Sequence, residues 1–163
     1  KIGSGLQPDE FRALWNEGRA GHAGFKESLL LVAHALGWKM ENLTETLEPM
    51  IADHDITTEH FQVATGLTCG LHQIVKAETA EGYAIHFDLK MYLDAPDPHD
   101  AVRLESDPPV EAYLKGGVFG DSATVAAVIN AVPRVLAARP GVLLMTDIPL
   151  AAGASHTSPL LAA

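Results

Sequence analysis

The stretch from Lys115 to Gly141 constrains the fold most, because a glycine-rich turn leads there into a long helix that is almost free of charge. We predict this helix over residues 122–138, with Asp121 as its N-cap and Pro133 as a source of bending. Apolar side chains fall on nearly every face of the predicted helix. Such a helix needs cover, so we expect it to be buried on most sides or to face another domain or subunit.

The glycine turn at residues 116–120 invites comparison with phosphate-binding loops, because it lies between a strand-like run and the start of a helix. Its spacing is not G-x-G-x-x-G, and no Walker lysine follows it. Asp121 at the helix start would also repel an anion. We therefore interpret the turn as a tight strand-to-helix connection.

Length and charge restrict the class of protein. The chain has 163 residues and a formal net charge of −10, which argues against binding to nucleic acid or to an anionic membrane surface. Cys69 is its single cysteine, and no apolar run approaches the length of a membrane span. We expect a cytoplasmic protein that contacts neither nucleic acid nor membrane. The start at Lys1 rather than Met suggests either a trimmed chain or a segment of a longer protein.

The order of the remaining elements predicts an α+β fold. Two helices are expected first, at residues 7–17 and 25–36. Strands are expected after them at residues 43–47, 56–65, 67–78, 83–94, 102–105 and 110–114. In the 83–94 strand, apolar and polar residues alternate, which is typical of a half-buried strand. The turn at 79–82 predicts a hairpin between the third and fourth strands.

These elements predict one domain over residues 1–149, with a mixed, mainly antiparallel sheet and helices on one face. Residues 150–163 mix small, polar and apolar side chains, and we expect them to form a loose tail.

The sequence contains no catalytic signature of its own. No Ser-His-Asp or Cys-His order is present, although the chain has eight histidines. Asp53, Asp55 and His60 could hold a divalent metal, but they lack a fixed helical spacing and are interpreted as a charged, solvated loop. We therefore predict no metal site.

Three residues are candidates for contact with a ligand. His22 is flanked by a glycine-rich loop, so a ligand or backbone can approach it closely. His72 faces the opposite way from Gln73 on a predicted strand, and Asn130 is a lone amide in an apolar helix. For each of the three, a structural role with a satisfied hydrogen bond is the alternative.

Several ordered motifs resemble one protein family. GHAGFKES at residues 21–28 and AHALGW at 33–38 resemble the "GHxGxxES…AxALGW" stretch of 2,4-diaminopentanoate dehydrogenase-like proteins. GLHQ at 70–73 resembles their "GxHQ", and the segments between 116 and 149 resemble "GGxxGDxATAxxxxNAIPRV…PG…DLP". The family includes the native amine dehydrogenases and is related to dihydrodipicolinate reductase. The resemblance extends from about Leu6 to Pro149, and Phe119 departs from it where a polar residue is expected.

The resemblance implies that only half of a family protein is present. Family members have an N-terminal Rossmann domain that binds NAD(P), and a C-terminal domain that closes over the substrate and builds the oligomer. This chain is similar to the second domain alone, like that of dihydrodipicolinate reductase, and lacks the glycine fingerprint of the first. The acidic catalytic residue of the family belongs to the missing part, so no catalytic residue is expected here.

The implied function is substrate binding and oligomerisation in an enzyme that reduces an imine with NAD(P)H, or that runs the reverse deamination. The expected partners are a small-molecule amine or carbonyl compound and further copies of the chain, in a dimer or tetramer. His22, His72 and Asn130 are then candidate substrate contacts, and NAD(P) would bind mainly outside this segment. Two alternatives stay open: a free-standing ligand-binding or dimerisation module, and a metal-dependent enzyme that uses Asp53, Asp55 and His60.

Overall fold

The computed structural model describes residues 2–149 of the chain. By its internal contacts the chain divides into two compact units, residues 1–96 and 97–163. The first unit contains the helices α1 and α2 and the strands β1 to β5, and the second contains β6, β7 and α3. The tail predicted at residues 150–163 lies outside the described residues, and the prediction of one domain up to residue 149 stays a prediction.

Both N-terminal helices form where the sequence predicts them. In α1, Pro8–Asn16, the proline occupies the first turn, and the backbone N–H of Gln7 donates to Glu10 Oε2 at 3.0 Å, which caps the start of the helix. α2, Phe25–Leu36, begins after Gly24 and ends at Gly37. Both of these glycines have left-handed φ angles, 82° and 70°, which favour glycine.

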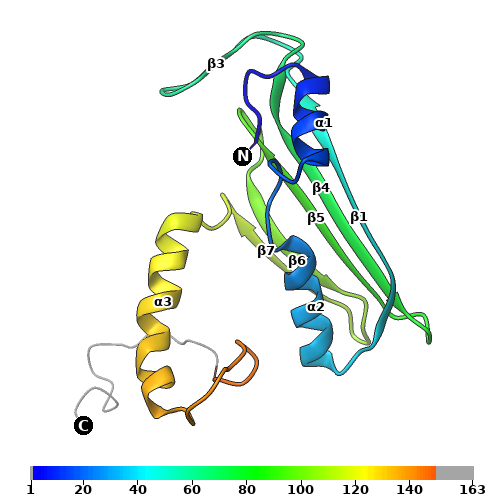
Figure 1. Ribbon diagram of the computed structural model, residues 1–163, viewed down its shortest axis with the longest axis vertical. Helices are drawn as coiled ribbons and strands as arrows, with labels where there is room; N and C mark the ends of the chain where they lie inside the picture. Colours follow the sequence, from blue (N-terminus) through cyan, green and yellow to red (C-terminus); the bar gives the residue numbers. More distant parts are fainter. Residues whose placement is uncertain (1, 150–163) are drawn as a thin grey trace. The chain divides into compact units, whose positions relative to one another are not determined.

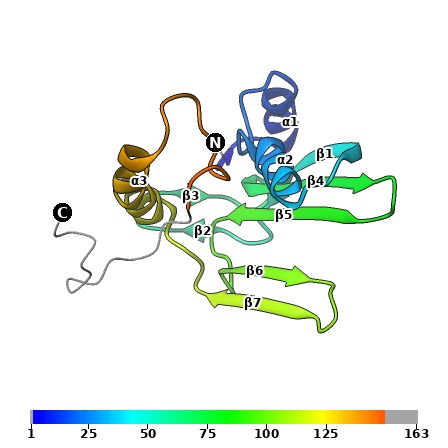
Figure 2. The same ribbon diagram turned by 90° about the horizontal axis from the view of Figure 1, so that it is seen from below.

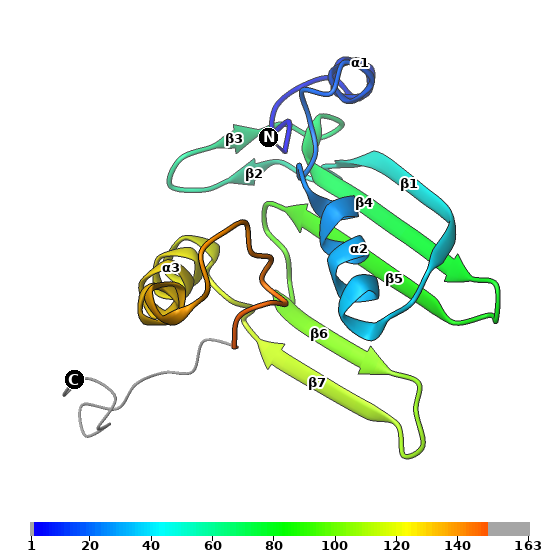
Figure 3. The same cartoon turned by 60° about the horizontal axis from the view of Figure 1, so that its bottom comes forward.

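The main sheet has three strands in the order β1-β4-β5, with both pairs antiparallel (Figures 1 and 3). Its strands are β1, Met40–Ile51; β4, Thr68–Thr79; and β5, Ala84–Tyr92. Leu47, Gln73 and Leu89 are paired across the sheet and therefore share one face. The predicted hairpin between β4 and β5 is confirmed.

The core of the first unit lies between this sheet and the helices α1 and α2, which cover one of its faces (Figure 2). Leu29 of α2 packs with Val75 and Ala77 of β4, and Phe11 of α1 packs with Leu47 and Leu71. The inward residues of β5 extend these clusters; they are Ile85, Phe87 and Leu89. The alternation predicted for this strand is therefore confirmed over residues 85–90, but Tyr83 and Met91 are exposed, and Tyr92, predicted on the other face, packs against a buried cluster. The α+β fold with helices on one sheet face is confirmed.

The single strand predicted at residues 56–65 is wrong. The structure has two short paired strands there, β2, Ile56–Thr57, and β3, Gln62–Val63. Thr58 reverses the chain between them, because its hydroxyl oxygen accepts a hydrogen bond from Phe61 N at 2.9 Å. Such side-chain-to-backbone bonds compete with the regular ladder of an extended strand.

The second unit has an antiparallel hairpin followed by a helix. The hairpin pairs β6, His99–Leu104, with β7, Val110–Lys115, and α3 spans Gly120–Ala137 with Pro133 inside it (Figure 3). The prediction of Asp121 as the N-cap is wrong, because Phe119 occupies that position. The helix begins earlier than predicted, because Ala123 N donates the first backbone bond of the helix to Phe119 O at 3.0 Å, and Asp121 therefore lies inside the first turn. Among the helices that the structure describes, none is long and apolar enough to cross a membrane.

Candidate functional site

The loop between α1 and α2 carries His22 and lies close to the sheet. Gly21 has a φ of 89°, and a Cβ atom there would approach Trp15 and Leu47 to 2.8 Å. Any larger residue would therefore be strained and would collide with both side chains. The glycines around His22 thus allow the loop to pass directly over Trp15 and β1.

Gln73, in the main sheet, holds this loop in place through hydrogen bonds to the backbone of His22. Its side chain is 1% exposed, on the helix-covered face of β4. Its Oε1 accepts from His22 N at 2.7 Å, and its Nε2 donates to His22 O at 3.3 Å and to Glu45 Oε1 at 2.9 Å. A buried amide is stable only when its donors and acceptor have partners, and here the loop backbone and a carboxylate supply them.

A pocket of about 200 Å³ lies beside this amide. It is bounded by the loop, the first turn of α2 and two strands, with Glu45 and Gln73 on the sheet side. The remaining lining residues are Trp15, Gly18, Ala20, His22, Ala23, Gly24, Phe25, Lys26 and Glu27. The pocket mixes aromatic side chains with charged ones and lies wholly within the first unit, and we take it as the candidate site for a small molecule.

The three predicted contact residues do not share one face of the sheet. The His22 side chain is exposed beside the pocket, with Nδ1 3.2 Å from Ala23 O and its ring 6.1 Å from that of Phe25. His72 points to the helix-free face, where its Nε2 lies 2.9 Å from Asp88 Oδ1. Asn130 belongs to α3 in the second unit. A substrate role for each of the three stays a prediction.

Reasoning from sequence overlooked Glu45 and the structural role of Gln73. A signal was present in β4, where Leu71, Gln73, Val75 and Ala77 follow one another on the inward face. One amide among three apolar residues on a buried face must find hydrogen-bond partners, and this requirement marks it as an anchor. Glu45 carried no such signal, because its burial depends on the neighbouring loop.

The acidic loop at residues 53–60 is organised by hydrogen bonds within the protein. His54 Nδ1 lies 2.5 Å from Asp53 Oδ1, and its Nε2 lies 3.2 Å from Asp94 Oδ2. These bonds, the one to Asp53 first, raise the pKa of His54. Asp55 instead accepts from Thr65 N at 2.8 Å. Over residues 2–149, no group of three His, Cys, Asp or Glu side chains is arranged to hold a metal ion.

The glycine turn before α3 agrees with its interpretation as a tight strand-to-helix connection. Gly116 and Gly117 have left-handed φ angles of 85° and 68°, and Val118 N donates to Asp100 Oδ2 at 2.7 Å. A carboxylate of the protein thus already accepts the bond from this backbone N–H of the turn. The strands beside the turn are antiparallel, so residues 97–120 do not fit the strand–glycine–helix site of a nicotinamide nucleotide.

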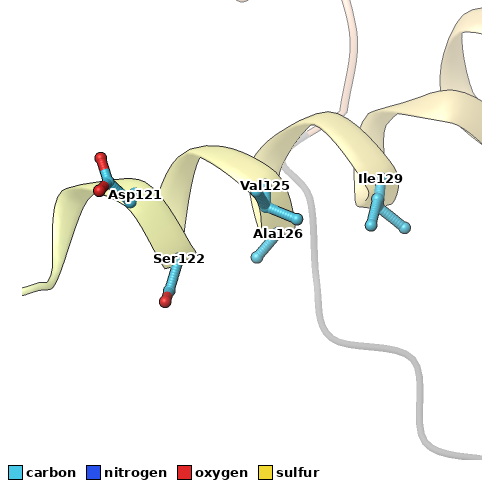
Figure 4. A pocket seen from close by; sticks show the side chains of 5 residues that line it. All are labelled: Asp121, Ser122, Val125, Ala126 and Ile129. Atoms are coloured by element: carbon cyan, nitrogen blue, oxygen red, sulfur yellow. The ribbon is translucent and has the colours of Figure 1, made fainter.

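One side of α3 forms an open and mostly apolar hollow (Figure 4). The side chains that line it project from successive turns of the helix; they are Asp121, Ser122, Val125, Ala126 and Ile129. Val125 and Ile129 are exposed, and no residue of α3 is buried. This surface is the expected consequence of a helix with apolar residues on many faces.

Comparisons with known proteins agree with this fold. Residues 1–159 match the family model of the 2,4-diaminopentanoate dehydrogenase C-terminal domain. The chain is 31% identical over 160 residues to 2,4-diaminopentanoate dehydrogenase of Acetoanaerobium sticklandii, covering 91% of this chain and 44% of that protein. Its fold is similar to that of an amine dehydrogenase from Mycobacterium smegmatis, with a TM-score of 0.77 at 24% identity over 93% of this chain and 46% of the other. The chain thus spans about half the length of these relatives.

Proposed function

Because this chain belongs to the 2,4-diaminopentanoate dehydrogenase C-terminal domain family, we propose that it is the substrate-binding and oligomerisation domain of an NAD(P)-dependent oxidoreductase that acts on amines or imines. The observation that carries the proposal is the His22 loop, held over a small pocket by the buried amide of Gln73. The relative from Acetoanaerobium sticklandii is named as a dehydrogenase of a diamino acid, which is a molecule of suitable size for such a pocket.

In this proposal the domain positions the substrate and does not itself supply the hydride. A nicotinamide cofactor supplies the hydride when it is bound, and it is held by a part of the polypeptide outside residues 1–163. Gln73 keeps the loop in one conformation, so the pocket is formed before the substrate arrives. Such preorganisation lowers the entropy lost on binding and orients the reacting group.

The proposed role in oligomerisation is supported by the second unit. One face of the β6–β7 hairpin is exposed and mostly apolar; besides Asp100 it consists of Val102, Leu104, Val110, Ala112 and Leu114. An isolated two-stranded hairpin is only marginally stable in water. Exposed apolar faces of this kind are typical of surfaces that meet another domain or subunit. The helix-free face of the main sheet, which carries His72 and Lys90, is a second candidate surface for a partner copy.

The test uses the complete polypeptide that contains this sequence. We expect amine-dependent reduction of NAD(P)⁺, and we expect His22→Ala and His72→Ala to change KM or kcat more than the melting temperature. Two controls are Lys76→Ala, on the same sheet face as His72, and Arg19→Ala, near His22 but paired with Glu17. An active polypeptide whose kcat and KM are unchanged by both histidine variants would contradict the assigned contacts. No turnover with any amine or carbonyl compound would favour a non-catalytic module.

A cytoplasmic location and a dimer or tetramer complete the proposal. Sedimentation equilibrium of the complete polypeptide should give a mass of two or four chains. A monomer at the highest attainable concentration would contradict the proposed role in oligomerisation but would not bear on the proposed substrate binding.

A further inference from the structure

The carboxylate of Glu45 is the charged group on the sheet side of the pocket of the first unit. It is half-buried, and its one hydrogen bond from the protein comes from Gln73 Nε2 at 2.9 Å. A carboxylate offers about four lone-pair sites, so most of its accepting capacity is unused. Between residues 2 and 149, no lysine, arginine or histidine nitrogen forms an ion pair with it.

Gln73 holds this carboxylate in a defined position. The same Nε2 atom that donates to Glu45 also donates to His22 O, while Oε1 accepts from His22 N. The amide is 1% exposed and cannot turn without breaking all three bonds. Glu45 therefore faces the pocket as a fixed acceptor, which is a property of binding sites rather than of mobile surface carboxylates.

The surroundings of Glu45 favour a cation over an anion. Two carboxylates, Glu27 and Glu45, line the pocket against one ammonium, Lys26. The positive N-terminal end of α2 is already met by Glu27 in its first turn. Trp15 and Phe25 supply aromatic walls, and the faces of aromatic rings attract cations.

We propose that this pocket is a subsite for the ammonium group of a primary amine, with the Glu45 carboxylate as its acceptor and specificity-determining group. The proposal rests on the function given above in taking the cation to be part of the amine substrate. An alkyl ammonium donates up to three hydrogen bonds, and charge-assisted bonds to a fixed carboxylate are stronger than neutral ones. Its alkyl chain would lie against Trp15 and Phe25.

The experiment is an NMR titration of the full chain with propylammonium. The chain has two tryptophans and should therefore give two indole N–H signals. Trp15 lines the pocket, whereas Trp38 stacks on Tyr83 with ring centroids 5.0 Å apart and serves as an internal reference. Trp38→Phe assigns the signals. We expect a saturable shift of the Trp15 signal with propylammonium, and little shift with propanol or propionate at the same concentration.

Variants of two glutamates test the role of the carboxylate. Glu45→Gln keeps the shape of the side chain and should weaken propylammonium binding by about tenfold, because it removes a charge-assisted bond. Glu78→Gln removes the same charge from the helix-free face of the sheet, in β4, and should leave binding unchanged. If Glu45→Gln unfolds, the comparison of propylammonium with propanol and propionate in the wild-type chain still decides the question.

Three outcomes would overturn the proposal: no saturable shift of Trp15, an equal or larger shift with propanol or propionate, or unchanged propylammonium binding in a folded Glu45→Gln variant. The titration needs neither nucleotide nor turnover. Selective binding of propylammonium without any dehydrogenase activity would therefore reject the proposed function and keep the subsite. Activity without that selectivity would reject the subsite alone.

Discussion

Leu29 of α2 and Val128 of α3 are both apolar helix residues, but Leu29 is fully buried whereas Val128 leaves 62% of its surface exposed. The difference extends to the two units. In the first unit, buried side chains form three clusters, two of them between the helices and the main sheet, while no residue of α3, β6 or β7 is buried. Amphipathic elements can form a core within one short segment, but elements with apolar residues on many faces need surface from elsewhere.

This contrast predicts that similar truncations to alanine will have very different effects on the free energy of unfolding. Leu29→Ala should cost about 2–5 kcal/mol, because it leaves a cavity against Val75 and Ala77. Val128→Ala should stay within about 0.5 kcal/mol, since little of that side chain is removed from water and alanine favours a helix. Urea unfolding of both variants of the 163-residue chain measures the difference. Similar losses would show that α3 is as well covered as α2.

A second comparison uses two glycines. A Cβ atom on Gly70, in β4, would lie 2.3 Å from Tyr92 Cβ and 2.4 Å from Met91 O, so Gly70→Ala must displace β5. We expect a loss of about 1–3 kcal/mol. At Gly120, the first residue of α3, nothing lies within 4 Å of such an atom, and Gly120→Ala should change stability by less than about 0.5 kcal/mol. Thermal melts of the two variants test this, and an unaffected Gly70→Ala variant would contradict the close approach of β5.

The smallest effect concerns pH and the loop of the first unit that carries His54. Hydrogen bonds to Asp53 and Asp94 raise the pKa of His54, so the folded state binds this proton more tightly than the unfolded state does. The resulting stabilisation is fully present below the ordinary histidine pKa and is lost as pH rises through the raised value. Melting curves between about pH 5 and pH 9 should therefore differ between the wild type and His54→Gln, most at the acidic end.

An NMR titration of His54 gives the matching site-specific measurement. A pKa of His54 at or below the ordinary histidine value would show that the two carboxylates do not hold the imidazolium in solution.

Much of the fold follows from local patterns, and the errors have local causes. The alternation of 83–94 predicted both the strand and its inward face, and Pro8 and Gly37 marked helix ends correctly. The prediction for 56–65 failed because one threonine hydroxyl reverses the chain at Thr58. For the site, the sequence indicated His22 and the GLHQ motif, yet the anchoring role of Gln73 and the presence of Glu45 were apparent only in three dimensions.

The sequence by itself determined the element types, the buried face of the sheet and the family, because periodicity, glycine positions and ordered motifs are local properties of the chain. Only the tertiary structure decided that His22 and His72 lie on opposite faces and that Glu45 meets the His22 loop. Those relations join residues that are 23 to 51 positions apart, such as the 51 between His22 and Gln73. Strand register and loop closure set them, and neither is fixed by any short stretch of sequence.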